Sequence, residues 1–105
     1  MIEDIKDTDF TQKVINSSGP VLIDFWADWC GPCRMLTPII EELSQEMADK
    51  IKVVKMNIDE NPETPSSLGI RSIPTMMIFK DGKQIAARSG VLPKNSIQEW
   101  INSLI

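Results

Sequence analysis

Histidine is absent from this chain of 105 residues, and cysteine occurs only twice, at Cys30 and Cys33. A protein zinc site takes about four nitrogen and sulfur ligands, so one cysteine pair without histidine excludes it. Covalent haem attachment requires a histidine directly after the second cysteine, where this chain has Arg34. Catalysis by a cysteine–histidine pair within the chain is excluded for the same reason. We therefore expect no bound metal and no bound cofactor.

Long apolar runs and clusters of basic residues are missing as well. No run approaches the roughly 20 apolar residues that a membrane-spanning helix needs. The formal net charge of −4 argues against nucleic acid or an anionic membrane as a partner. Residues 1–4 are acidic and contain no apolar signal core, so we expect a cytoplasmic protein. The length and the apolar content of 42% predict a single domain over residues 1–105, which we expect to be a monomer.

The two cysteines lie in the segment Trp29-Cys30-Gly31-Pro32-Cys33. An apolar run, Val21–Ala27, precedes this segment, and apolar residues recur at helical spacing after it, over Arg34–Met47. A strand, a tight turn and a helix would place both sulfurs at a helix N-terminus, where unpaired backbone N–H groups favour a thiolate. A bridge across so short a loop constrains the unfolded chain little, so a purely structural disulfide is the weaker hypothesis. Exchange between dithiol and disulfide forms is the chemistry that remains.

Asp24 is the one charged residue in the apolar run Val21–Ala27. This run is too apolar for a half-exposed strand, so we expect it at the centre of the sheet, covered on both faces. Asp24 is then either a carboxylate that reaches water or a buried acid. In the next predicted strand, Ile51–Ile58, alternation places Lys55 on one face. Lys55 is either an ordinary solvent-exposed lysine or one that faces a buried acid.

The remaining segments predict further strands and helices. Together they indicate an α/β protein in which a mixed sheet is covered by helices on both faces. In chain order we expect an edge strand containing Ile2 and Ile5, a helix capped within Asp7–Asp9, a short helix starting at Asn61-Pro62 and ending at Gly69, a hairpin of Thr75–Phe79 and Gln84–Arg88 around Asp81-Gly82, and a last helix after Pro93.

These motifs resemble the thioredoxin family over nearly the whole chain. Asp24–Cys33 is similar to the family's active-site signature, and Lys55–Asp59, Ile73–Thr75, Lys80–Gly82 and Gly90 follow in the family's order and spacing. The resemblance implies the thioredoxin fold, a five-stranded mixed sheet flanked by four helices. It also implies a reductase of protein disulfides that is recharged by thioredoxin reductase, with NADPH as the electron source.

The resemblance also implies roles for individual residues. Cys30 would be the attacking nucleophile and Cys33 the resolving thiol, and the two would form the disulfide Cys30–Cys33 in the oxidised state. Asp24 would transfer the proton of Cys33, and Lys55 would modulate Asp24. Pro74 would be a cis-proline that faces the disulfide. The substrate-binding residues would be Trp29, Gly31, Pro32, Ile73, Pro74, Gly90 and Val91.

Three residues depart from those common in the family: Arg34 replaces a lysine, Ser72 a glycine, and Trp100 a smaller aromatic. Arg34 keeps the positive charge, Ser72 lies where it could alter the substrate groove, and we expect Trp100 to pack in the core. Two rival functions stay open. One is an oxidase or isomerase on the same scaffold, although oxidants of this fold typically carry histidine where this chain has Gly31-Pro32. The other is a binding module without enzymatic activity.

Overall fold

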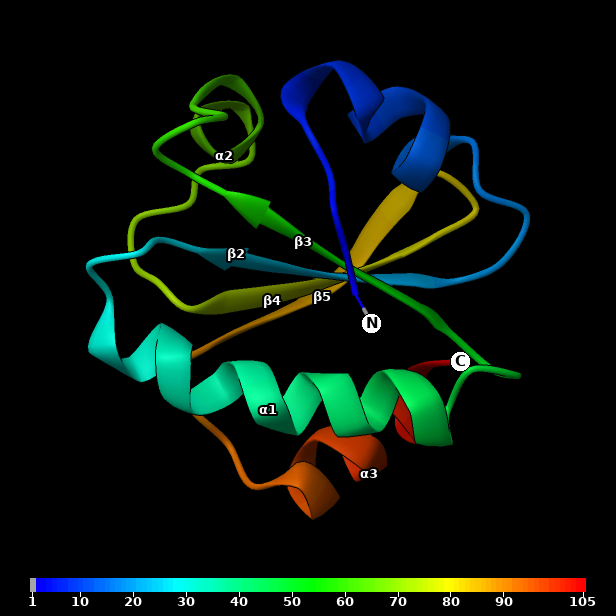
Figure 1. Ribbon diagram of the computed structural model, residues 1–105. Helices are drawn as coiled ribbons and strands as arrows, with labels where there is room; N and C mark the ends of the chain where they lie inside the picture. The colour runs from blue at the N-terminus through cyan, green and yellow to red at the C-terminus, as the bar shows by residue number, and fades with distance from the viewer. Residues whose placement is uncertain (1) are drawn as a thin grey trace.

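The computed structural model describes residues 2–105, which form one mixed β-sheet with helices on both of its faces (Figure 1). The strand order is β1-β3-β2-β4-β5. The first three strands in the chain pair in parallel, and β4 and β5 are antiparallel to their neighbours. The predicted five-stranded mixed sheet is therefore confirmed. Its strands are β1 (Glu3–Asp4), β2 (Val21–Trp26), β3 (Lys52–Asn57), β4 (Thr75–Lys80) and β5 (Lys83–Ser89).

Helices cover the sheet in two groups. In Figure 1, α1 and α3 lie on one face, and α2 lies on the other face beside the N-terminal helical segment, drawn in blue. The three α-helices are α1 (Gly31–Glu46), α2 (Glu63–Ser67) and α3 (Lys94–Leu104). The predicted N-terminal helix is a 3-10 turn, η1 (Asp7–Asp9), continued by a π-helix, η2 (Thr11–Ile15). Its expected cap within Asp7–Asp9 is wrong, because the N-cap residues are Lys6 for η1 and Phe10 for η2. With this segment the structure has the four helices expected.

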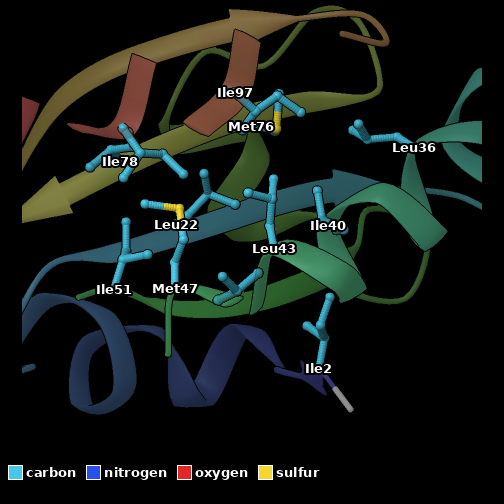
Figure 2. Packing of buried hydrophobic residues seen from close by; sticks show 12 residues of the cluster. Ile2, Leu22, Leu36, Ile40, Leu43, Met47, Ile51, Met76, Ile78 and Ile97 are labelled. Carbon is cyan, nitrogen blue, oxygen red and sulfur yellow. The ribbon is translucent and has the colours of Figure 1, made fainter. Parts of the chain in front are cut away.

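Strand β2 is the centre of the molecule, as its apolar sequence predicts. Successive side chains of a strand point to opposite faces of the sheet, so β2 contributes to two separate cores. Leu22 packs with α1 and α3 in the cluster shown in Figure 2, which includes Leu36, Ile40 and Ile97. Val21, Ile23 and Phe25 alternate with Leu22 and Asp24 along the strand and pack on the opposite face. Both faces of β2 are therefore closed to water around Asp24.

Helix α1 begins directly after Cys30, which is its N-cap residue. Pro32 lies in the first turn, where its missing N–H leaves no hydrogen bond unmade. Pro38 lies inside the helix and cannot donate to the carbonyl of Arg34, yet the helix continues to Glu46. Its buried side chains are Cys33, Leu36, Ile40 and Leu43, which hold it against the sheet in spite of that loss.

The predicted hairpin of β4 and β5 is confirmed. Asp81 and Gly82 both have positive φ angles, 54° and 78°, as a tight turn that matches the twist of the strands requires. In contrast, the expected cap of α2 by Asn61 is wrong, because the N-cap residue is Pro62. The free N–H groups of Glu63 and Thr64 instead donate to the carboxylate of Asp7, at 3.1 and 2.8 Å.

Trp100 packs against the core cluster beneath α1 and α3, as predicted. The guanidinium of Arg88, from the edge strand β5, lies 5.5 Å from the centre of the indole ring. Within residues 2–105, no helix has the length and apolar character needed to cross a membrane.

Candidate active site

Cys30 and Cys33 form a disulfide at the start of α1, with their Cα atoms 5.3 Å apart. Cys30 is the N-cap residue and Cys33 lies in the first turn. The backbone N–H of Cys33 points at Cys30 Sγ, with a nitrogen–sulfur distance of 3.2 Å. The exposed fraction is 4% for Cys30 and 1% for Cys33. Cys30 is the more accessible cysteine, but the difference is small.

This placement favours a negative charge on the sulfur of Cys30. A helix N-terminus carries a partial positive charge and backbone N–H groups without helical partners. One of these groups already donates to Cys30 Sγ, so a thiolate formed there on reduction would find its donor in place. The chemistry available at this position is thiolate attack on a disulfide.

Asp24 lies in the middle of β2 and is completely buried. Neither of its carboxylate oxygens has a hydrogen-bond partner among residues 2–105. Burial raises the pKa of Asp24 from 3.8 to about 7, against the opposing effect of Lys55 and with a contribution from Asp4. Of the two interpretations left open by the sequence, the buried acid is the one observed. A carboxyl group with this pKa can both accept and release a proton near neutral pH.

Lys55 stands directly opposite Asp24, because the two residues are paired in the parallel register of β2 and β3. It is half-buried, and its Nζ lies 5.0 Å from the centre of the Trp26 ring. Lys55 makes no ion pair with Asp24 among the residues that the structure describes. The positive charge of Lys55 nevertheless lowers the pKa of Asp24. The lysine thus acts on Asp24 through space.

Trp29 precedes the disulfide and is the most exposed large apolar residue of the described chain, at 66%. Its indole Nε1 donates to Asp59 Oδ2 at 2.8 Å. Beside it lies an open pocket of about 330 Å³ whose lining is mainly apolar. The pocket is lined by Trp29, Ile58, Ile70, Arg71, Ser72 and Ile73.

The Ile73–Pro74 peptide bond is cis, the form expected for Pro74. Ile73 packs against the cluster that contains Cys30 and Cys33, so the loop before β4 lies beside the disulfide. The carbonyl of Pro74 accepts a hydrogen bond from the N–H of Gly90 at 2.9 Å. This bond joins the loop to the end of β5.

Hydroxyl groups connect the same two segments. Thr75 Oγ1 donates to the carbonyl of Ser72 at 2.6 Å and lies 3.2 Å from Ser89 Oγ. Ser72 Oγ is 3.3 Å from the same hydroxyl. The serine that departs from the family's usual glycine therefore contributes a side-chain bond between the loop and β5.

The structure brings most of the predicted site residues to one end of the sheet. Cys30, Gly31, Pro32 and Cys33 share the start of α1, and Ile73 packs against the cluster that contains the two cysteines. Gly90 is tied to Pro74, but Val91 packs against the core cluster and lies outside the lining of the pocket.

Sequence reasoning missed four residues of this end of the molecule: Ile58, Asp59, Ile70 and Arg71. Ile58 and Asp59 directly follow β3, at the carboxyl end of a strand parallel to β2. Their position after β3 could have indicated that they lie near the disulfide, since loops after parallel strands gather at one edge of a sheet.

A family model described as thioredoxin matches residues 1–103 of the chain. The chain belongs to the thioredoxin family. It is 56% identical to the thioredoxin of Rickettsia prowazekii (strain Madrid E) and 57% identical to that of Rickettsia conorii (strain ATCC VR-613 / Malish 7), in each case over the full length of both chains. It is 48% identical to the thioredoxin of Rhodospirillum rubrum, over 99% of this chain and all of that protein.

Membership of the thioredoxin family accounts for the arrangement at the start of α1. Cys30-Gly31-Pro32-Cys33 holds the redox-active disulfide, and the chain is an oxidoreductase that acts on protein disulfides. Within residues 2–105, no three His, Cys, Asp or Glu side chains are grouped so that they could hold a metal ion.

Proposed function

We propose that the chain is a general reductase of protein disulfides, in which Cys30 attacks and Cys33 resolves. The observation that carries this proposal is the hydrogen bond from the Cys33 N–H to Cys30 Sγ at the start of α1. Of the two sulfurs, Cys30 Sγ is the acceptor of that bond and belongs to the more exposed residue. It is therefore the sulfur whose thiolate is the better stabilised and the easier to reach.

In the first step, the Cys30 thiolate attacks one sulfur of a target disulfide. A bond forms between Cys30 Sγ and that sulfur, and the other target sulfur leaves as a thiolate. In the second step, the Cys33 thiolate attacks Cys30 Sγ. The mixed disulfide breaks, the target is released with both of its sulfurs reduced, and the Cys30–Cys33 disulfide forms. The two electrons gained by the target come from the pair of cysteines.

Cys33 must lose its proton before the second step, although burial of the residue disfavours the thiolate. We assign the proton transfer to Asp24. Its pKa of about 7, raised by burial, suits it to accept a proton at neutral pH. Lys55 modulates this basicity, because its positive charge lowers the pKa of Asp24.

The target would bind as an extended segment across the loop that contains Ile73 and Pro74. Backbone pairing of this kind tolerates many side chains, as a general reductase requires. The apolar pocket beside Trp29 would receive one side chain of the target. Gly31, Pro32, Gly90 and Val91 would complete the surface around the sulfurs.

We further propose that thioredoxin reductase returns the disulfide to the dithiol with electrons from NADPH, in the cytoplasm. The chain would act as a monomer of one domain, without a bound cofactor. Gly31-Pro32 supports the direction of transfer, because this spacer adds no positive charge to stabilise the thiolate and hold the pair in its reduced form.

The test is catalysed reduction of insulin disulfides, first with dithiothreitol and then with NADPH and thioredoxin reductase as the electron source. We expect both donors to support turnover and Cys30→Ser to abolish it. A redox titration separates the rivals, since an oxidase or isomerase would equilibrate at a markedly higher potential. Cellular function retained by Cys30→Ser would identify a binding module instead.

A further inference from the structure

Three charged residues stand in one row across three neighbouring strands. In the parallel register of the sheet, Asp4 of β1 is opposite Lys55 of β3, and Lys55 is opposite Asp24 of β2. Because paired residues of neighbouring strands point to the same face, all three side chains lie on the face covered by α1 and α3. Exposure falls along the row, from Asp4 at the surface through half-buried Lys55 to fully buried Asp24. The lysine therefore lies between two carboxylates, and among residues 2–105 it makes an ion pair with neither of them.

The indole of Trp26 contacts two members of this row, Asp4 and Lys55. Its Nε1 donates to Asp4 Oδ1 at 3.3 Å. The face of the same ring lies 5.0 Å from Lys55 Nζ, a distance at which a cation is attracted to the ring. Trp26 thus holds the Asp4 carboxylate in place and offers Lys55 a position that is not on Asp24.

Other elements packed around Asp24 contribute little charge. The partner of Asp24 in β4 is Met76, and the buried side chains of α3 are Ile97 and Ile101. The buried side chains of α1 are apolar apart from Cys33, which is disulfide-bonded in this structure and does not titrate. The charged groups that act on the pKa of Asp24 are Lys55, which lowers it, and Asp4, which raises it, while burial remains the largest cause.

We propose that Asp4 is a positioning residue for disulfide exchange. Together with Trp26 it attracts the ammonium group of Lys55 toward the edge of the sheet, so that the positive charge of Lys55 neutralises the Asp24 carboxylate less. Asp4 touches neither sulfur and acts through Lys55 and Asp24. The proposal rests on the proposed role of Asp24 in proton transfer to and from Cys33. If Asp4 carried no charge, Asp24 would be the only carboxylate of the row that attracts Lys55. Lys55 would then lower the pKa of Asp24 further, and Asp24 would be a weaker base.

The size of the effect follows from the spacing of the strands. Asp4 and Asp24 are two strands apart, which is about 10 Å. Direct repulsion over that distance changes the pKa of Asp24 by about 0.3 to 1.2 pH units, for effective dielectric constants of about 80 and 20. Redistribution of Lys55 between the two carboxylates adds to this change.

The test is the titration of Asp24 in the oxidised protein, followed by carboxyl ¹³C NMR, in the Asp4→Asn variant. Asparagine keeps an oxygen that can accept from Trp26 and removes only the charge. We expect the titration midpoint of Asp24 to fall by about 0.3 to 1.2 pH units or more. The acid limb of the pH profile for insulin reduction should move in the same direction, which a purely structural role of Asp4 would not produce.

Glu3→Gln is the matched control. Glu3 is the other residue of β1, points to the opposite face, and pairs with Lys13 and Lys52. Its loss removes the same charge and should shift Asp24 clearly less than Asp4→Asn does. Equal shifts in the two variants, or no shift in Asp4→Asn, would overturn the proposal.

A second background isolates the part played by Lys55. In the Lys55→Gln variant, only the direct repulsion between Asp4 and Asp24 remains. Adding Asp4→Asn to this variant should therefore shift the titration midpoint of Asp24 less than Asp4→Asn shifts it in the wild type. Shifts of equal size in both backgrounds would show that Asp4 does not act through Lys55. The NMR titration does not depend on turnover. A wild-type protein unable to reduce insulin would therefore refute the proposed function, whereas an unchanged Asp24 midpoint in an Asp4→Asn protein that reduces insulin would refute this inference alone.

Discussion

Trp29 and Asp59 are joined by a hydrogen bond of 2.8 Å between the indole Nε1 and the carboxylate Oδ2. Trp29 immediately precedes Cys30, and Asp59 follows β3. With two thirds of its surface exposed, Trp29 has little packing to hold it, so this bond is its main orienting contact. It places the ring at the side of the pocket lined by Ile58, Ile70 and Ile73.

Replacement of Asp59 by alanine should weaken substrate binding. A hydrogen bond of this kind contributes about 1 kcal/mol, which corresponds to about a five-fold loss in kcat/KM for a protein disulfide. The loss should appear mainly in KM, because the sulfurs are untouched. Asp59→Asn keeps an acceptor and should retain most of the activity, and the exposed neighbour Glu60 provides a control in Glu60→Ala. If Asp59→Ala matches the wild type in KM, the bond does not orient Trp29 for binding.

Asp24→Asn should stabilise the folded protein at neutral and alkaline pH. The pKa of Asp24 is raised from 3.8 in the unfolded chain to about 7 in the fold, so the wild type loses stability as the pH rises between these values. A difference of about 3 pH units corresponds to at most ~4 kcal/mol of unfolding free energy above pH 7. Urea denaturation at pH 8 and at pH 3.5 measures it: the variant should be more stable at pH 8 and indistinguishable at pH 3.5. The exposed Asp49→Asn is the control.

The same substitution should slow the release of reduced substrate. Without Asp24, Cys33 has lost its base, and general base catalysis contributes a factor of about 100 or more to such steps. Single-turnover decay of a mixed disulfide at pH 7 is the measurement, and we expect it to be at least about ten-fold slower. An Asp24→Asn protein that is both more stable and equally fast would remove Asp24 from the mechanism while leaving its burial intact.

Serine variants of the two cysteines should behave differently toward target proteins. Cys33→Ser keeps the nucleophile and should accumulate mixed disulfides, because no thiol remains to release them. Cys30→Ser has lost the sulfur at the N-cap of α1 and should trap little. Non-reducing electrophoresis after incubation with oxidised insulin makes the comparison. Equal trapping by both variants would reverse the assigned roles.

Asp7→Ala should destabilise the protein through α2, which lies more than 50 residues further along the chain. The Asp7 carboxylate accepts from the N–H groups of Glu63 and Thr64, and loss of such a cap costs about 0.5–2 kcal/mol. Although burial acts to raise the pKa of Asp7, bonds from Thr64 and Glu63 outweigh it and lower the pKa.

The pH dependence of that effect follows from the lowered pKa. The stabilising contribution of Asp7 is present above pH 3.8 and disappears as the pH falls through the lower pKa of the folded state. Urea denaturation at pH 7 and pH 2.5 should therefore show a larger difference between Asp7→Ala and wild type at pH 7 than at pH 2.5. Thr8→Ala, at an exposed neighbour, should change neither value. Unchanged hydrogen exchange at the Glu63 and Thr64 amides of Asp7→Ala would contradict the capping role.

Local chemistry was sufficient to predict much of the fold. The apolar run of β2, the turn at Asp81-Gly82 and the helical spacing after Cys33 each depend on residues close in sequence. The type of the first helix was predicted less well. The sequence places Phe10 and Val14 four residues apart, a spacing that fits a π-helix over Thr11–Ile15 as well as it fits an α-helix.

Contacts between residues far apart in the chain could not be predicted from the sequence. Asn61 has the chemistry of a cap, but the carboxylate that caps α2 belongs to Asp7. The bond between Trp29 and Asp59 and the row containing Asp4 depend on loop packing and strand register, which no local pattern determines. Family resemblance identified Asp24 and Lys55 as a pair, whereas Asp4 emerged only from the register of β1.

The strand order has a consequence for how the chain is made. Both partners of β2, β3 and β4, follow it in the sequence, and β1 pairs only with β3. At a translation rate of about 5–20 residues per second, the roughly 30 residues between the end of β2 and the end of β3 take about 1.5 to 6 s to emerge, and during that time the apolar strand β2 has no neighbour to pair with. Ribosome-bound chains from which residue 50 has just left the exit tunnel should therefore be digested by protease far faster than the full chain after its release. Newly synthesised copies need protection from aggregation during this interval, before any cysteine chemistry begins.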